Sequence, residues 1–218
     1  MTENISTVTE KRIEVVKRET FWYNLDVSSK LKYKKKKGKK MMKEERIEEI
    51  AAQYPLCQYN FLDTKELVFS EQVRYICETE CPRYGKSWAC PPATGTVEEC
   101  RKRCLEFEKV FVFTTVAEVE DIANMECTLP TRQEHEKVMR AIRDEIAAEA
   151  EEVLGLSTDS CDFCRECTYP DAPCRHPEMM NPCIESYGIL VTDAAEKAEI
   201  DFFCDSNTVT WFSMIFFR

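Results

Sequence analysis

Glycine and long apolar runs are both scarce in this sequence. Its 218 residues include only 5 glycines, which excludes a collagen-like chain and argues against a glycine-rich repeat protein. No run reaches the roughly 18–20 apolar residues that a membrane-spanning helix needs. The first 20 residues carry charge throughout and lack the apolar core of a signal peptide. We therefore expect a cytoplasmic protein without a membrane span.

Histidine is rarer still, and the common catalytic motifs are missing. The chain has 2 histidines and contains no Ser/His/Asp set, no Walker loop and no G-x-G-x-x-G motif. The tripeptide GKS at 85–87 lacks the upstream glycine of a Walker loop and lies between cysteines. The sequence therefore leaves open whether the protein is an enzyme, and it names no substrate.

Charge is unevenly divided along the chain. Residues 1–40 contain 12 Lys and Arg against 5 Asp and Glu, whereas residues 41–218 contain 18 against 35. An acidic body lacks the positive charge that phosphate contacts need, so nucleic-acid binding is not expected. We expect 1–40 to be a solvated, disordered basic arm. The alternative is that this arm touches nucleic acid or anionic lipid.

The basic composition of the first 40 residues gives way to a helical pattern at Met41 or Met42. The stretch MMKEERIEEIAAQY has apolar residues at helical spacing, with acidic residues on the other face. One hypothesis is that translation starts here and that 1–40 is an upstream extension. We divide the chain into the basic arm, 1–40, and a cysteine-rich metal-binding domain, 41–218.

Helical and strand patterns alternate along this domain. Capping boxes that begin at Thr96 and Thr131 predict the start of two helices. Gly155 is expected to end the second of these. The expected helices cover 41–54, 97–107, 131–154 and 193–200. The expected strands lie within 66–77, 109–116, 188–191, 201–204 and 208–217. The fold class is therefore α/β or α+β, a single compact domain with a small mixed sheet.

The chain contains 13 cysteines, a large number for a cytoplasmic protein. Thiols stay reduced in the cytoplasm, and an odd count fits complete pairing poorly, so a disulfide framework is not expected. Metal ligation is the remaining physical reason to cluster cysteines in this way.

The stretch from 160 to 177, SCDFCRECTYPDAPCRHP, has the clearer metal-binding spacing. Its cysteines follow the pattern C-x2-C-x2-C-x6-C, and the C-x2-C-x2-C part matches iron–sulfur loops of bacterial ferredoxins. Zinc is the competing metal, although zinc sites usually have two separated C-x2-C pairs. A set of buried cysteines without metal is the third alternative. The candidate ligands here are Cys161, Cys164, Cys167 and Cys174.

The stretch CETECPRYGKSWACPPATG, residues 77–95, offers three cysteines in the pattern C-x3-C-x8-C. The candidate ligands here are Cys77, Cys81 and Cys90. Three thiolates can hold a cubane cluster and leave one iron open to substrate, or a fourth ligand comes from elsewhere. The candidates for that ligand are Cys57, Cys100, Cys104 and Cys183. For each of these, and for Cys127 and Cys204, a small buried hydrophobic residue is the alternative.

Taken together, the two loops and the later segment NPCIESYGILV resemble the "predicted metal-binding protein" family. This is a domain of unknown function with two cysteine loops, found in anaerobic bacteria and archaea. The resemblance covers about residues 42–200 and implies iron–sulfur binding. The family pattern matches the seven candidate ligands in the two loops, and also Arg175, Pro177, Glu185 and Gly188. Cys183 departs from the pattern, because that position is typically serine.

Two kinds of function follow from these observations. The first is a redox protein with one or two [4Fe-4S] clusters, which passes electrons to a redox partner protein or reduces a small molecule at an open iron. Arg175 and Lys86 could then steer an anionic substrate, although both also fit ordinary surface charge. The alternative is a zinc-stabilised structural or interaction module, or a cluster-based redox sensor without catalysis.

Overall fold

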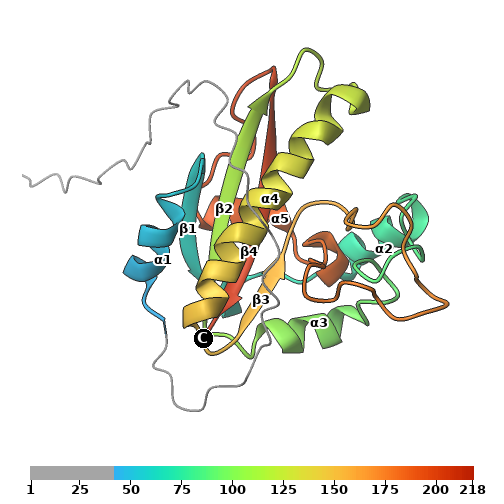
Figure 1. Ribbon diagram of the computed structural model, residues 1–218, viewed down its shortest axis with the longest axis horizontal. Coiled ribbons are helices and arrows are strands. Elements are labelled where there is room, and N and C mark those ends of the chain that lie inside the picture. Colours follow the sequence, from blue (N-terminus) through green and yellow to red (C-terminus); the bar gives the residue numbers. More distant parts are fainter. Residues whose placement is uncertain (1–41) are drawn as a thin grey trace, which may run out of the picture. The chain divides into compact units, whose positions relative to one another are not determined.

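A computed structural model describes residues 42–218 of the chain (Figure 1). The basic arm expected over 1–40 lies outside these residues, and so does the hypothesis of an upstream extension. The helices are α1 (Glu44–Ala51), α2 (Glu71–Thr79), α3 (Val97–Cys104), α4 (Met125–Glu149) and α5 (Val191–Lys197). The strands are β1 (Gln58–Asp63), β2 (Lys109–Glu118), β3 (Val153–Leu156) and β4 (Thr208–Phe217). Short 3-10 turns occupy Thr64–Glu66 and Glu185–Tyr187.

Four strands form one sheet in the order β1-β2-β4-β3. Phe111 on the central strand β2 lies opposite Phe61 of β1 and Ile215 of β4, and all three neighbouring pairs are antiparallel. The fold is therefore α+β, one of the two expected classes. The sheet is antiparallel where a mixed sheet was expected, because the long connections between strands return the chain in the opposite direction instead of forming βαβ crossovers.

Helices cover both faces of this sheet. On one face, α1 and α4 pack against Phe111 and Phe113 (Figure 1). On the other face, α3 and α5 pack against Val110 and Val112. A strand that is buried on both sides needs apolar residues in succession, which explains why β2 reads as a continuous apolar run without alternation.

The strands expected within 66–77 are not formed, because the second half of this segment folds as α2. Ser70 caps the helix by accepting a hydrogen bond from the amide of Gln72 at 3.1 Å. Arg74 is buried on α2 and donates to the carbonyl of Gly95 at 2.7 Å. The cap and this tertiary contact override the strand propensity of the valine, tyrosine and isoleucine nearby.

Helix α4 begins and ends earlier than expected. Its cap is Asn124, which accepts a hydrogen bond from the amide of Glu126 at 2.9 Å. Thr131 does not begin the helix but lies inside it, and its hydroxyl donates to the carbonyl of Thr128 at 2.7 Å. Gly155 does not end the helix either, since it lies in β3. A capping pattern is a local signal and is ambiguous when a stronger cap precedes it.

Two further strands were expected wrongly, over 188–191 and 201–204. In the first, Ile189 forms only an isolated bridge with Phe69, and Val191 already begins α5. The second is irregular. The helices expected over 97–107 and 193–200 are confirmed as α3 and α5, and the strands over 109–116 and 208–217 as β2 and β4.

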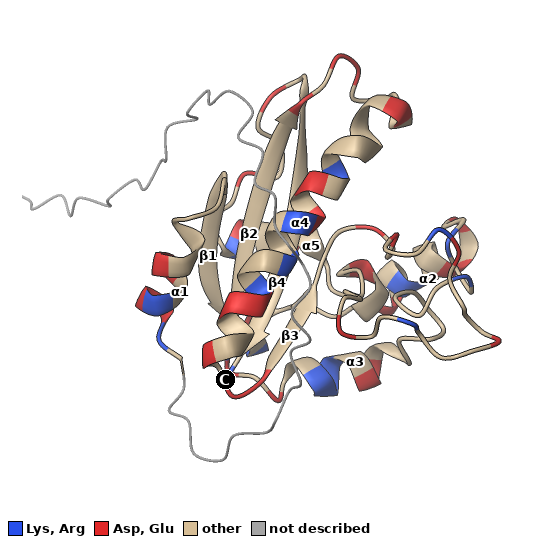
Figure 2. Ribbon diagram, in the orientation of Figure 1, with Lys and Arg blue, Asp and Glu red and all other residues tan. Residues whose placement is uncertain are grey.

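None of the helices between residues 42 and 218 has the length and apolar character needed to cross a membrane. The surface of α4 instead carries acidic and basic side chains in alternation (Figure 2). The part of the molecule that holds α2 and the two cysteine-rich stretches lies beside the sheet, next to β3 and α3 (Figure 1).

Candidate metal centre

The second cysteine loop, residues 160–177, leaves β3 and forms no helix or strand. Its four cysteines are all partly buried, and all four line one cavity. The other residues that line this cavity are Ser87, Trp88, Phe163, Thr168, Arg175, His176 and Met180. The sequence pattern thus brings together the four thiols that it was expected to bring together, around a space enclosed mainly by apolar and aromatic groups.

Arg132 of α4 fastens the start of this loop. Its guanidinium donates to the carbonyl of Ser160 at 2.9 Å and pairs with the carboxylate of Asp162. The Arg132 side chain is only 3% exposed, and its Nε makes no hydrogen bond, although the Asp159 carboxylate lies 3.6 Å away. A buried cation with a spare donor therefore lies directly beside Cys161.

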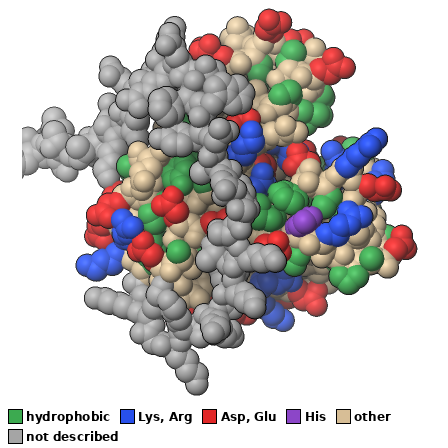
Figure 3. Space-filling view, in the orientation of Figure 1, with side chains coloured by type: hydrophobic (Ala, Val, Ile, Leu, Met, Phe, Trp, Pro, Cys, Tyr) green, Lys and Arg blue, Asp and Glu red, His purple; other side chains and the backbone are tan. Residues whose placement is uncertain are grey.

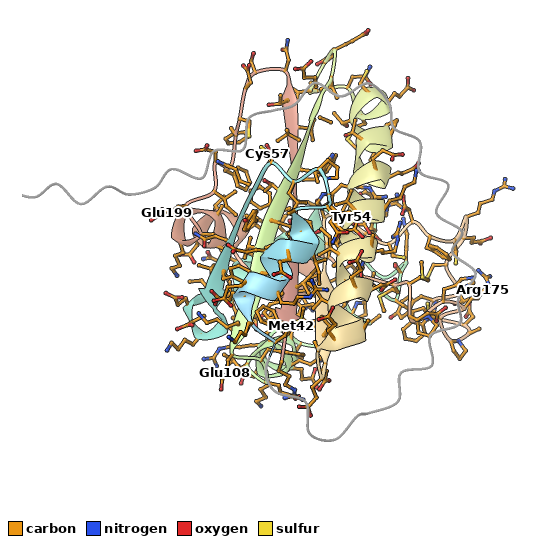
Figure 4. All side chains as sticks on the ribbon, turned by 60° about the vertical axis from the view of Figure 1, so that its left-hand side comes forward. Met42, Tyr54, Cys57, Glu108, Arg175 and Glu199 are labelled. Carbon is orange, nitrogen blue, oxygen red and sulfur yellow. The ribbon has the colours of Figure 1, made fainter. Side chains whose placement is uncertain are left out.

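Arg175 has a structural contact within the same loop. Its guanidinium donates to the carbonyl of Glu166 at 2.9 Å, across nine residues of chain. The side chain remains exposed in the cysteine-rich part of the molecule (Figure 4). Thr168 adds a second cross-link by donating to the carbonyl of Pro173 at 2.8 Å. These bonds fix the path of a segment that lacks regular secondary structure.

The first cysteine loop begins on α2. Cys77 lies in the last turn of this helix, and Cys81 follows two residues after the helix ends. The pKa of Cys77 is raised to about 11, first by burial and then by the neighbouring Cys81 and Glu185, with a smaller contribution from Cys90. The three thiols of the loop are therefore close enough to influence one another.

The thiol of Cys90 ionises more readily than that of an ordinary cysteine. Its pKa is lowered to about 7, mainly by a hydrogen bond with the Cys183 side chain and also by one with Ser160. Burial opposes this shift, and Cys90 is only 3% exposed. Metal ligation requires the thiolate, so a low pKa favours Cys90 as a ligand. Its partner Cys183 shows the opposite effect, since the shared hydrogen bond and burial raise the pKa of Cys183.

The two cysteine loops pack against each other. The indole of Trp88, in the first loop, donates to the carbonyl of Ala172 in the second loop at 3.1 Å. Its ring meets that of Tyr169 edge-on with centroids 4.9 Å apart. The thiol of Cys90 donates to the hydroxyl of Ser160 at 3.1 Å. Hydrophobic and basic side chains gather on the surface of this part of the molecule (Figure 3).

The sulfurs surround a space and do not converge on a single point. Among residues 42–218, no three Cys, His, Asp or Glu side chains are arranged to hold one metal ion. A zinc ion needs four ligands within about 2.0–2.3 Å of one position. An iron–sulfur cluster instead spreads its thiolates over several irons. The four thiols of the second loop line one space, and Arg132 contacts the residues on either side of Cys161.

The remaining cysteines lie elsewhere. Cys100 and Cys104 are fully buried in the core beneath α3, as expected for small apolar residues. Cys57 lies at the start of β1, away from the loop that carries Arg175 (Figure 4). Cys204 is exposed, which contradicts the expectation of burial, and it contacts Cys57. Of the four candidates for a fourth ligand, Cys183 is the one that contacts a thiol of the first loop.

Several residues of this centre could not be found from the sequence. Arg74 and Arg132 are isolated basic residues inside helices, and Ser160 and Trp88 belong to no recognised motif. Each one acts through a partner distant in the chain, such as the carbonyl of Ser186, which accepts from Arg74. Among these residues, only Ser160 has a sequence feature that points to the site, because it directly precedes Cys161.

The arrangement defines a cysteine-rich protein with thiols gathered at one side of an antiparallel α+β fold. The profile of one family, described as "Predicted metal-binding protein (DUF2284)", matches residues 60–217. The chain belongs to this family. Neither the curated proteins nor the solved structures contain a match to it.

Proposed function

We propose that this protein binds iron–sulfur clusters of the [4Fe-4S] type through its two cysteine loops and serves in electron transfer. The observation that carries the proposal is the single cavity lined by all four cysteines of the second loop. The ligands of one group would be Cys161, Cys164, Cys167 and Cys174. Those of the other group would include Cys77, Cys81 and Cys90. A bound cluster supplies one-electron chemistry.

The residues around the thiols support this role. Arg74 and Arg132 are buried cations that would offset the negative charge of thiolates and cluster. Trp88, Phe163 and Met180 line the cavity and would limit the access of water, which tunes the potential of a cluster. The contacts between the two loops would keep the two groups close, so that an electron could pass from one to the other.

A redox partner protein would approach at these loops. Arg83, Lys86, Arg165 and Arg175 are exposed there, and the aromatic ring of Phe163 is 43% exposed. An apolar contact surrounded by charges of this kind suits a transient complex. We place the protein in the reducing cytoplasm, because the ligand thiols must remain unpaired.

Cysteine replacement tests the proposal. Single changes to alanine at 161, 164, 167 and 174 should each lower the iron content of protein purified without oxygen and weaken the broad visible absorption of thiolate-bound iron. Cys127→Ala is the matched control, since Cys127 lies at the start of α4 outside both loops. Unchanged iron in all four variants would remove the second loop from the site, and a colourless protein with bound zinc would favour the structural module instead.

A further inference from the structure

The first cysteine loop supplies three thiols, and the residue that completes the set can be identified from its neighbours. The segment around Cys183 is fastened beside the end of β3. The amide of Ile184 donates to the carbonyl of Ser157 at 2.9 Å. The amide of Ser157 donates in turn to the carbonyl of Pro182, also at 2.9 Å. Cys183 is 8% exposed, so its side chain is held inside the molecule by a fixed backbone.

Cys183 belongs to the segment 183–187, which contacts the first loop and packs against α2. Its thiol lies close enough to that of Cys90 for each to shift the pKa of the other. Two residues later, the carbonyl of Glu185 lies 3.9 Å from the sulfur of Cys77. The segment 183–185 therefore lies next to Cys90 at one end and next to Cys77 at the other. Only a small movement of the chain is needed for Cys183 to join the thiols of the first loop.

One backbone donor already points at the sulfur of Cys183. The amide of Ser186 donates to the Cys183 sulfur at 3.2 Å, and hydrogen bonds of this kind stabilise the charged form of a ligand. The carbonyl of the same Ser186 accepts from the buried guanidinium of Arg74. A backbone donor thus lies next to the Cys183 sulfur, and the Arg74 cation favours the charged form of Cys77 in the same group.

We propose that Cys183 is the fourth protein ligand of the first group, an inference that rests on the proposed function. The group then consists of Cys77, Cys81, Cys90 and Cys183. Each of the two groups would have four thiolates, and no iron of the first group would be left open for a substrate. The protein would act as an electron carrier and not reduce a small molecule at that site. Family members with serine at this position would lack the fourth thiolate.

Glu185 is the nearest competitor for the same role. Its carboxyl group lies close enough to Cys77 and Cys183 to raise the pKa of both thiols. Iron–sulfur clusters are held by cysteine thiolates, so the thiol is the better candidate. Glu185→Gln therefore serves as the matched control, because it keeps the size of the side chain and removes its charge.

The test measures iron, sulfide and the electron paramagnetic resonance spectrum of the full chain after anaerobic purification. Cys183→Ala should lose up to about half of the wild-type iron or show the signal of a three-iron cluster, because only the first group is affected. Cys183→Ser keeps the size and the bond to Ser186, so it should fold, and it should lower the iron content or alter the spectrum. Glu185→Gln should keep the wild-type iron and spectrum.

The outcomes separate the two proposals. A wild-type protein without iron would end the proposed function itself. If the wild-type protein holds iron, and both Cys183 variants keep its full amount and its spectrum, the inference about Cys183 is overturned while the proposed function stands. Loss of iron in Glu185→Gln but not in Cys183→Ser would also overturn it and assign the position to the carboxylate. Circular dichroism of each variant shows whether the fold is retained.

Discussion

The thiol of Cys90 lies 3.1 Å from the hydroxyl of Ser160, to which it donates a hydrogen bond. This contact joins two cysteine groups that are separated by 70 residues of chain, because Ser160 directly precedes Cys161. The side chain and backbone of Ser160 have different partners, since its carbonyl accepts from Arg132. One serine therefore connects the acidic thiol of the first loop to the buried cation that holds the second.

Removal of the Ser160 hydroxyl should raise the pKa of Cys90. The bond with Ser160 is one of the causes that lower this pKa to about 7, so Ser160→Ala should shift it upward. The metal-free protein can be titrated by the ultraviolet absorbance of thiolates, with Cys90→Ala as the reference that identifies the signal. Titration curves that are identical with and without the hydroxyl would show that the contact has no effect on Cys90.

Loss of the Arg132 cation should weaken both folding and iron binding. Arg132→Met leaves the Asp162 carboxylate without its buried partner, and because Asp162 is 26% exposed, the loss of unfolding free energy should be below the roughly 3–5 kcal/mol of a fully buried pair. The loss of a positive charge beside Cys161 should also make a bound cluster harder to reduce, so its potential should become more negative.

Arg101→Met is the matched control for Arg132→Met. Arg101 is half exposed on α3, where it pairs with Glu98, and exposed pairs of this kind contribute about 0–1 kcal/mol. Denaturant unfolding and redox titration of both variants would make the comparison. Equal effects of the two changes would contradict the role given to Arg132.

The buried His135 should make stability fall in mild acid. Its ring nitrogens lie 2.8 Å from the hydroxyls of Thr115 and Ser213, and burial lowers its pKa from 6.5 to about 4. Between these values the unfolded chain binds a proton that the folded protein does not. His135 therefore contributes stability that is complete above pH 6.5 and decreases by up to about 1.4 kcal/mol per pH unit as the pH falls toward 4.

His135→Gln isolates this contribution. The variant lacks the titrating ring, so its stability should depend less steeply on pH between 6.5 and 4 than that of the wild type. The neighbouring Glu136, whose raised pKa acts in the opposite direction, is present in both proteins and cancels in the difference. Urea unfolding at several pH values gives the two slopes. Parallel slopes would mean that His135 is protonated in the folded protein.

Gly188→Ala should destabilise the segment that carries Cys183. Gly188 has a φ of 75°, and an added Cβ would lie 2.9 Å from Val97 and 3.2 Å from the carbonyl of Ser70. The left-handed backbone costs about 1–2 kcal/mol for a residue with a side chain, and overpacking adds about 1–3 kcal/mol.

Gly85→Ala separates these two contributions to the Gly188 effect. Gly85 has a similar φ of 68°, but nothing lies within 4 Å of the added Cβ. Its replacement should therefore cost only the backbone contribution, about 1–2 kcal/mol. Denaturant unfolding should show a larger loss for Gly188→Ala than for Gly85→Ala, and equal losses would rule out the close packing of Gly188 against α3.

Segments with a periodic apolar pattern or a clear cap could be predicted from the sequence. Segments whose structure depends on contacts with distant parts of the chain could not. The apolar run of β2 and the capping box at Thr96 are strong local signals, and both are confirmed. Helix α2 was mistaken for strands because its valine, tyrosine and isoleucine favour a strand, whereas its buried Arg74 acts through the carbonyls of Gly95 and Ser186, which only the folded chain brings near. Gly155 was mistaken for a helix end because the role of a glycine depends on what packs against it.

The candidate site shows the same division. The regular cysteine spacing predicted that the four thiols of the second loop lie close together. In the structure, all four line one cavity. The contact between Cys90 and Cys183 could not be read from the sequence, because 92 intervening positions carry no spacing rule. Arg132 and Trp88 were missed for the same reason, since their partners come from other elements.

The most direct measurement of the central claim is a chemical analysis of the full chain purified without oxygen. Iron, acid-labile sulfide and zinc would be determined on the same sample, together with the protein concentration. We expect iron and sulfide in equal amounts and several of each per chain, with little zinc. Zinc at one or two ions per chain without sulfide would contradict the account, because the thiols would then hold isolated ions and not clusters.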